Sequence, residues 1–386
     1  MNTIEQDKIY IAGTYSRAEL VAVSGKGALI LDENGKEYID LGSGIAVDTF
    51  GVCDTEWIAA VEAQLHKLQH ISNLYYTKPQ AELAQLLCER TGMKRVFFAN
   101  SGAEANECAI KCARKYSSDK YGEGRSTIIT LKNSFHGRTL ATLSATGQDA
   151  MHVHFAPFVE GFKNVAANDF ESLEQSCDST VCAVMLELVQ GEGGVIPLEK
   201  AYVSSVARLC AERDILLIID EVQTGNGRTG SLYAFMQYDI MPDIVSTAKG
   251  LSGGLPFGAC MLSERVKDTL TPGSHGSTFG GNPVCAAGAV NIISRLDAAL
   301  MAEVKAKGDY IRAQLENAAG VKSVTGLGLM LGIEIEGDAK EVVSECLKQG
   351  VIVLTAKSKI RLLPPLNIEQ SQLEKAIRIL KGVIAK

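Results

Sequence analysis

The sequence predicts an α/β protein with a large, mainly parallel sheet and a second, smaller α/β domain. In the middle of the chain, short apolar segments alternate with stretches of helical spacing, which is typical of a parallel sheet covered by helices on both faces. After about Gly280 the pattern changes to long helical stretches, then short strands and a last helix. The opening fifty residues contain short strands joined by turns, with a hairpin signal at Asn34-Gly35.

The expected elements follow this order along the chain. Helical spacing runs from about Glu56 to Arg90. The alternating part then contains apolar strand segments at 95–99, 126–131, 181–188 and 215–220, and helical segments at 104–116 and 200–213. A helical stretch at 286–318 leads to strands at 329–336, 351–355 and 360–364. No flexible linker interrupts the chain, so the domains are expected to pack tightly.

Composition and charge argue against several classes of protein. Of the 386 residues, 46% are hydrophobic and 22% are charged, as in an ordinary globular protein. The net charge of −7 argues against nucleic acid or an anionic membrane as a partner, because both require clustered Lys and Arg. The first residues lack the pattern of a signal peptide and no apolar stretch is long enough to span a membrane, so a cytoplasmic protein is expected.

No metal site is expected. The ten cysteines are scattered and include no C-x-x-C pair. His152 and His154 could bind a metal, but no third ligand lies at a suitable spacing, and a strand explains this segment better.

The segment "FFANSGAEANE" passes from a predicted strand through a turn of small residues into a predicted helix. Backbone N–H groups at such a helix start, here at Gly102 and Ala103, can bind a phosphate. Ser101 and Glu104 also match a capping box, so this segment alone leaves a purely structural role open.

Two further segments supply chemistry that suits one ligand. Lys249 follows a strand-like segment and enters a glycine-rich loop, where an apolar setting lowers the pKa of an amine and makes it nucleophilic. Asp220 ends the apolar run "ILLIID", and Gln223 follows three residues later. Pyridoxal phosphate fits all of these features, because its phosphate, its aldehyde and its pyridinium nitrogen need a helix start, a lysine and a carboxylate.

A competing signal lies in the same region. Gly225, Gly227 and Gly230 spell G-x-G-x-x-G, the motif of nicotinamide-dependent oxidoreductases. In those enzymes the motif follows its strand directly and opens a helix. Here "EVQT" intervenes, and "RTGSLYAF" does not resemble an opening helical turn. The sequence therefore disfavours a nicotinamide-dependent oxidoreductase.

The motifs together resemble the class III pyridoxal-phosphate aminotransferases of fold type I, and among them the acetylornithine aminotransferases. The resemblance covers nearly the whole chain and rests on "NSGAEANE", "FHGRTL", "QGEGGV", "DEVQTGNGRTG", "AKGLSGGLPFGA", "GSTFGGNP", "GLGLMLGIE" and "IRLLPP". It implies an N-terminal segment, 1–55, that packs with the small domain, a large cofactor-binding domain, 56–280, and a C-terminal small domain, 281–386.

The resemblance also implies how the cofactor is held. Lys249 would form the Schiff base with pyridoxal phosphate, Asp220 would hold the pyridine nitrogen, and Gln223 would lie near the ring hydroxyl. The other cofactor contacts implied by the motifs are those of Gly102, Ala103, Phe135, Glu221, Val222 and Thr278. Phe135 would stack on the ring. Thr278 would bind the phosphate in the neighbouring subunit, which implies a homodimer with shared active sites.

Substrate binding is assigned by the same resemblance. Arg138 would bind the carboxylate of the acylated donor, and Arg361 would bind the α-carboxylate of glutamate or 2-oxoglutarate. Glu192 would cover Arg361 while the donor reacts at its distal amine, and Ser277 would touch substrate in the neighbouring subunit. The catalytic residues would be Lys249 and Asp220.

The implied reaction moves an amino group from N2-acetylornithine to 2-oxoglutarate, giving N-acetylglutamate 5-semialdehyde and glutamate, a step of arginine biosynthesis. Succinylornithine, ornithine, 4-aminobutyrate and succinyl-diaminopimelate aminotransferases share the cofactor motifs and remain alternatives. Gly44 stands where ornithine enzymes carry a tyrosine, which argues against free ornithine. Residues 51–55 and 187–190 also depart from the family pattern, as "GVCDT" and "ELVQ".

Overall fold

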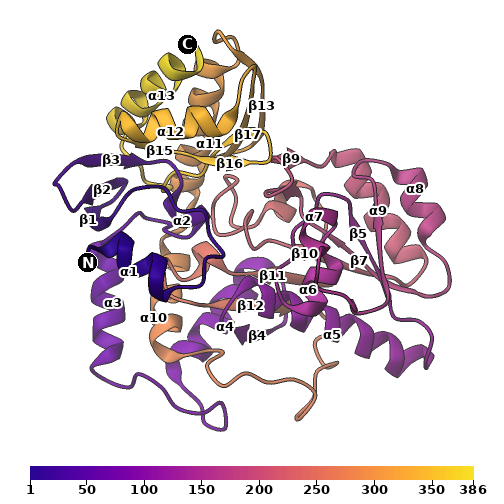
Figure 1. The fold of residues 1–386 in the computed structure, drawn as a ribbon. Coiled ribbons are helices and arrows are strands. Elements are labelled where there is room, and N and C mark those ends of the chain that lie inside the picture. The colour runs from indigo at the N-terminus through magenta and orange to yellow at the C-terminus, as the bar shows by residue number, and fades with distance from the viewer.

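The computed structural model describes all 386 residues, and a seven-stranded sheet forms its centre (Figure 1). Its strands, in spatial order, are β4 (Arg95–Ala99), β12 (Gly258–Leu262), β11 (Ile244–Thr247), β10 (Leu216–Asp220), β7 (Val181–Leu186), β5 (Thr127–Leu131) and β6 (Phe162–Val165). Only β12 runs antiparallel to its neighbours, and all other adjacent pairs are parallel. The predicted mainly parallel sheet is therefore confirmed.

Alternate side chains of this sheet enter two separate hydrophobic cores. Met185 and Ile218 pack in a core that includes residues of helix α5 (Gly102–Tyr121). Leu186 and Ile219, their neighbours in sequence, belong to a larger core that includes residues of α9 (Lys200–Glu212). Successive side chains of a strand point to opposite faces, so almost continuously apolar strands require a cover of helices on both sides.

The remaining helices and short strands around the central sheet lie where turns and caps interrupt the chain. They are α3 (Thr55–Leu65), α4 (Lys78–Thr91), α6 (Leu140–Ala145), α7 (Asp149–His152), α8 (Phe170–Ser176), α10 (Pro283–Arg295), the 3-10 helices η1 (Ala234–Gln237) and η2 (Lys249–Leu251), and the strand pair β8 (Val189–Gln190) and β9 (Ile196–Pro197). The helical stretch predicted after residue 56 is thus divided into α3 and α4, because residues 66–77 are not helical.

The two ends of the chain meet in a second region with two four-stranded sheets. One sheet joins β1 (Ala22–Lys26), β2 (Leu29–Asp32) and β3 (Glu37–Asp40) to β15 (Val351–Ile352), and the other contains β13 (Val321–Leu327), β14 (Met330–Ile335), β17 (Lys359–Leu362) and β16 (Leu354–Ala356). The helices of this region are α11 (Ala298–Leu315), α12 (Ala339–Lys348) and α13 (Gln370–Ile384). The parallel pairing of β3 with β15 places the N-terminal strands beside the C-terminal residues, as Figure 1 shows.

The hairpin predicted at Asn34-Gly35 is confirmed. β2 and β3 pair antiparallel, and Gly35 closes the turn with a φ of +79°, a conformation that glycine adopts without strain. Two local predictions were wrong. Residues 3–10 form a helix, α1 (Thr3–Tyr10), because Asn2 and Glu5 cap it reciprocally. The segment with His152 and His154 contains the short helix α7 instead of a strand.

A buried arginine joins the loop after β10 to both ends of the chain. The Arg228 side chain is 3% exposed and donates hydrogen bonds to the carbonyl oxygens of Leu329, at 3.2 Å, and Pro364. Its charge also faces Asp40, a buried carboxylate at the end of β3 that accepts from two backbone N–H groups. Removing either partner would leave a buried charge uncompensated, so this contact fixes the two regions relative to each other.

No single helix is long and apolar enough to cross a membrane. Helices α10 and α11 together have the length and composition of a membrane span, but they are bent by 77° relative to each other.

Candidate active site

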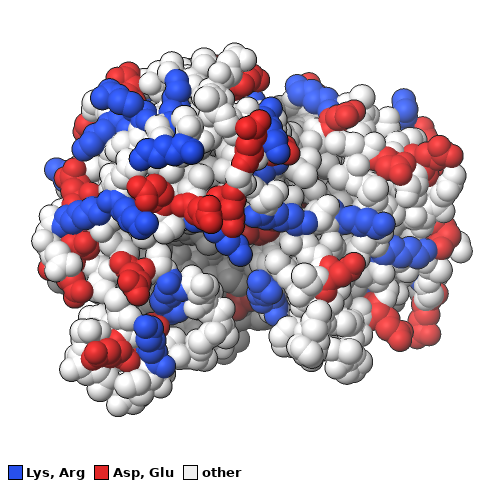
Figure 2. All heavy atoms as spheres, turned by 45° about the horizontal axis from the view of Figure 1, so that its top comes forward, with Lys and Arg blue, Asp and Glu red and all other residues white.

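A cavity of about 410 Å³ opens at the carboxyl end of β10, where ligands of parallel α/β sheets bind. The face of the molecule in Figure 2 has a hollow between two lobes, with acidic and basic side chains intermixed around it. Seven parts of the chain line the cavity. They are Val47, the turn before α5 with the first residues of that helix, residues 135–138, Glu187, the end of β10 with the residues after it, residues 248–249 and residues 254–257.

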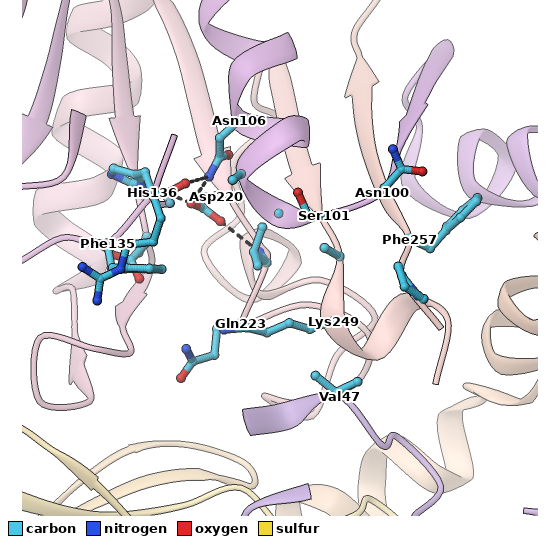
Figure 3. A pocket seen from close by; sticks show the side chains of 18 of the residues that line it. Val47, Asn100, Ser101, Asn106, Phe135, His136, Asp220, Gln223, Lys249 and Phe257 are labelled. Carbon is cyan, nitrogen blue, oxygen red and sulfur yellow. Dashed lines mark hydrogen bonds and ion pairs between the residues drawn. The ribbon is translucent and has the colours of Figure 1, made fainter. Parts of the chain in front are cut away.

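Asp220 is the most constrained carboxylate of this cavity, and its side chain is 3% exposed. Its Oδ2 accepts hydrogen bonds from His136 Nδ1 and Asn106 Nδ2, both at 2.8 Å, and its Oδ1 accepts from the backbone N–H of Val222 at 3.0 Å (Figure 3). Asn106 also donates to the carbonyl oxygen of His136 at 2.8 Å. These donors hold a negative charge at the strand end that burial alone would disfavour.

Two more titratable groups lie behind Asp220. Burial by itself would lower the pKa of His136, but the hydrogen bond to Asp220 and the charges of Asp220 and Glu187 raise it. Burial raises the pKa of Glu187 to about 7. Glu187 accepts from the backbone N–H of Phe135 at 2.8 Å, so it also fixes the segment that carries Phe135 and His136.

Lys249 lies in the same cavity, and no hydrogen-bond partner of its amine is present in the chain. Burial lowers the pKa of this amine, with the positive charge of Arg361 acting in the same direction and the negative charge of Glu192 opposing it. The backbone of Lys249 has a φ of +47°, which is strained for a residue other than glycine. Such strain is concentrated at functional sites, and here it presents an uncommitted amine to the cavity.

The start of α5 supplies free backbone donors. Ser101 caps the helix by accepting from the N–H of Glu104 at 3.1 Å, while the Glu104 carboxylate accepts from the N–H of Asn100 at 2.6 Å. The N–H groups of Gly102 and Ala103 have no acceptor within the chain, as expected at the first turn of a helix. Both residues line the cavity, so their N–H groups are available to an anion.

Phe135 and Arg138 lie along one wall of the cavity. The guanidinium of the exposed Arg138 stands 5.6 Å from the centre of the Phe135 ring. Val222 also lines the cavity, and its side chain packs so closely against Gly102 that a methyl group on Gly102 would collide with it. Phe135, Arg138 and Val222 thus line one cavity, while their predicted contacts with cofactor and substrate stay predictions.

Arg361 and Glu192 form a polar cluster beside the cavity with Gln223, which also lines the cavity. Arg361 comes from β17, and its side chain is 3% exposed. Its Nη1 donates to Glu192 Oε1 and to Gln223 Oε1, the latter at 3.1 Å. Gln223 Nε2 in turn lies 3.3 Å from Glu192 Oε1. Glu192 therefore pairs with Arg361 in this structure, and the nearby guanidinium lowers the pKa of Glu192 against the opposing effect of burial.

Five of the predicted site residues do not line the cavity, and they are Arg361 and Glu192 of the polar cluster together with Glu221, Ser277 and Thr278. The Glu221 carboxylate turns away from the cavity and accepts from the backbone N–H of Phe235 at 2.7 Å and from the hydroxyl of Thr224, so it supports the segment after β10 instead. Ser277 accepts from the side chain of Asn100 at 3.2 Å, and Thr278 is exposed. For both, the prediction concerns the cavity of a neighbouring subunit.

Asn106 and Glu187 were not predicted as site residues from the sequence. His136 entered the prediction only as part of the family motif "FHGRTL". Asn106 lies in "NSGAEANE" at the position one turn after Gly102, so it points back toward the start of α5. Glu187 ends an apolar strand segment, like Asp220. A carboxylate at the end of a buried parallel strand was therefore a signal that the sequence offered twice.

The burial of Glu221 has a consequence for stability. Burial raises the pKa of Glu221 to about 7 from 4.5, so the folded chain holds its proton more firmly than the unfolded chain. The proton on Glu221 therefore contributes to the stability of the folded chain. This stabilisation is fully present below pH 4.5 and is lost as the pH rises through 7. We predict that Glu221→Gln gains stability over the wild type by on the order of 3 kcal/mol between pH 5 and pH 8.

Urea unfolding of both proteins across this pH range measures the difference. The matched control is Glu212→Gln, which changes an exposed carboxylate on α9 and should follow the wild type. Parallel pH profiles for Glu221→Gln and the wild type would contradict the prediction.

Comparisons with known proteins agree with this fold and site. The family model described as Aminotransferase class-III matches residues 10–384. The acetylornithine aminotransferase of Haemophilus ducreyi is 52% identical, with 98% of each chain covered. The N-acetylornithine aminotransferase structure from Stenotrophomonas maltophilia aligns with a TM-score of 0.86 at 35% identity, over 99% of this chain and 98% of that one.

A structure of the ornithine aminotransferase from Toxoplasma gondii, with partial occupancy of PLP at its active site, aligns with a TM-score of 0.94 at 32% identity, over 99% of this chain and 93% of that one. These likenesses confirm the fold and the family resemblance. With a family model that matches almost its whole length and relatives of high identity, the chain belongs to the class-III aminotransferases.

Proposed function

We propose that the protein uses pyridoxal phosphate to transfer the amino group of N2-acetylornithine to 2-oxoglutarate. The observation that carries this proposal is the meeting of Lys249, the Asp220 carboxylate and the free N–H groups of Gly102 and Ala103 at one cavity. The same three features fit the aldehyde, the pyridine nitrogen and the phosphate of one cofactor.

The residues fit this cofactor chemically. When bound, the cofactor's protonated ring withdraws electrons from the substrate carbon that bears the amino group. Asp220 would keep the ring nitrogen protonated, because its charge is held at the cavity by His136 and Asn106. Gly102 and Ala103 would bind the phosphate, and Phe135 would lie against the ring face.

Lys249 would act as the general acid and base. Its Nζ has a lowered pKa and no hydrogen-bond partner, so it can accept the proton from the substrate carbon and donate it again. The strained backbone at Lys249 and the buried walls around it hold the amine in place and limit the entry of water.

Two arginines would select the substrates. Arg138 is exposed at the cavity wall and free to bind the carboxylate of the acylated donor. Arg361 would bind the α-carboxylate of glutamate or 2-oxoglutarate, after Glu192 has moved from it. In the closed pair Glu192 neutralises Arg361, which suits a donor that reacts at its distal amine.

The relatives favour acetylornithine over free ornithine as the donor. Curated acetylornithine aminotransferases match nearly the whole chain at 39% to 52% identity. The absence of a side chain at Gly44 agrees with this choice, because ornithine enzymes carry a tyrosine at the position aligned with it. Succinylornithine, 4-aminobutyrate and succinyl-diaminopimelate remain alternative donors, because their enzymes share the cofactor motifs.

The site would be completed by a second copy of the chain. Leu74, Tyr75, Tyr76 and Phe279 form an exposed apolar patch, with Tyr76 almost fully exposed and Leu74 85% exposed. Asn73 joins the two segments of the patch, because its Nδ2 donates to the carbonyl oxygens of residues 277 and 280 at 3.0 and 2.7 Å. An apolar patch of this kind marks an interaction surface. Ser277 and Thr278 lie beside it, so pairing of two chains there would bring them toward the partner's cavity.

The first prediction from the proposed function concerns Lys249. Lys249→Ala should lower turnover of acetylornithine with 2-oxoglutarate by at least about 1,000-fold, because no other lysine lines the cavity. Steady-state turnover and the bleaching of cofactor absorbance by acetylornithine both measure this loss. Lys132→Ala, which changes an exposed lysine outside the cavity, is the matched control and should keep wild-type turnover. Wild-type turnover in Lys249→Ala would exclude the proposed mechanism.

The second prediction concerns Arg138. Arg138→Leu should raise KM for acetylornithine by about 10- to 100-fold, the loss expected for a charged hydrogen-bonded contact, and leave KM for 2-oxoglutarate within about twofold. Half-reactions followed by absorbance separate the two substrates, and wild-type enzyme should react faster with acetylornithine than with ornithine. Arg95→Leu, at an exposed ion pair with Asp268, is the control. If the wild-type enzyme reacted faster with ornithine, the family assignment would stand, but acetylornithine would be the wrong donor.

The third prediction concerns the patch at Tyr76. Tyr76→Asp should weaken self-association by at least about tenfold, because a charge would be buried at an apolar contact. Sedimentation of the holoenzyme across a range of concentrations measures the mass. Tyr121→Asp, at an exposed tyrosine on the far end of α5, should remain a dimer. A wild-type protein that sediments as a monomer at all concentrations would refute the shared site.

A further inference from the structure

The side chain of Gln223 lies between Arg361 and Glu192 and contacts both. Its Oε1 accepts from Arg361 Nη1 at 3.1 Å, and its Nε2 donates to Glu192 Oε1 at 3.3 Å. Gln223 is 7% exposed, so water cannot readily replace these bonds. The amide does both because it carries an acceptor for the cation and, on a separate atom, a donor for the carboxylate. A glutamate here could not donate to Glu192.

Arg361 is only partly satisfied in this arrangement. All of its hydrogen bonds within the chain come from Nη1, and its Nε is buried without any partner. A guanidinium has five N–H donors, and leaving a buried donor unpaired is costly. The guanidinium therefore retains the capacity to bind a carboxylate through two nitrogens once Nη1 is released.

The loop that carries Glu192 is shaped around Gln223. A methyl group on Gly191 would come within 2.4 to 2.6 Å of the Oε1, Cδ and Nε2 atoms of Gln223. Gly191 thus leaves the space in which the amide lies flat against the loop backbone. The position of Gln223 is fixed by this packing as well as by its two hydrogen bonds.

We propose that Gln223 is a positioning residue that clamps the Arg361–Glu192 pair shut and thereby sets the affinity for dicarboxylate substrates. A five-carbon dicarboxylate that binds Arg361 must displace Glu192 and also the Gln223 oxygen from Nη1. A donor bound by Arg138 leaves the clamp closed. The inference rests on the proposed function, in which Arg361 binds glutamate or 2-oxoglutarate.

Binding of glutarate to the holoenzyme tests the clamp, because glutarate has the two carboxylates of the substrate but neither an amino nor a keto group. In calorimetry, Gln223→Leu should bind glutarate about tenfold more tightly than the wild type, which is the value of one hydrogen bond to a charged group. Unchanged or weaker binding would overturn the proposal. Gln237→Leu removes a half-buried amide that contacts Thr229 and Ser231 instead, and it should match the wild type.

A second variant tests the same clamp with Gln223 present. Gly191→Ala should push the amide away from Arg361 and lower both the Kd for glutarate and the KM for 2-oxoglutarate, while KM for acetylornithine stays within about twofold. A general disturbance of the site would raise both KM values and would count against the clamp. Arg361→Met should abolish glutarate binding. If Arg361→Met bound glutarate as tightly as the wild type, Arg361 would not be the substrate-binding residue. That result would refute the proposed function, whereas the Gln223 variant tests only the clamp.

Discussion

The hydrogen-bonded carboxylate of Asp220 is the interaction on which the cavity depends. An isolated charge at the end of a buried strand is costly, so its donors must come from the surrounding elements. His136 and Asn106 supply them from a loop and from α5, and Asn106 also bonds to the backbone of His136. One carboxylate thereby aligns β10, the start of α5 and the loop that carries Phe135. The free N–H groups of α5 and the aromatic wall face the same cavity for this reason.

The second constraint is that the polar cluster beside the cavity is built from two regions of the fold. Arg361 belongs to the C-terminal sheet, whereas Glu192 and Gln223 follow strands of the central region. The buried Arg228, which binds carbonyl oxygens near both β14 and β17, holds the two regions together. A substrate that engages Arg361 would therefore act on a contact between the two regions.

Much of the site was predictable because its signals are local. A strand that ends in Asp220, a lysine entering a glycine-rich loop and small residues before a helix are patterns of a few neighbouring residues. Glu221 shows where such patterns fail. It is adjacent to Asp220, yet successive side chains at a strand end point to opposite faces, so one carboxylate reaches the cavity and the other is buried against Phe235. The helix at residues 3–10 escaped notice because it buries no side chain and so carries no periodic apolar pattern.

The sequence by itself determined the fold class, the strand that bears Asp220 and the lysine of the site, because apolar periodicity and turn residues act over short distances along the chain. Only the tertiary structure decided which side chains meet. Asn106 reaches Asp220 across 114 residues, His136 reaches it across 84, and Gln223 meets Arg361 across 138. Such contacts depend on the order of strands in the sheet and on the packing of the C-terminal region against it, and neither is encoded in the spacing of neighbouring residues.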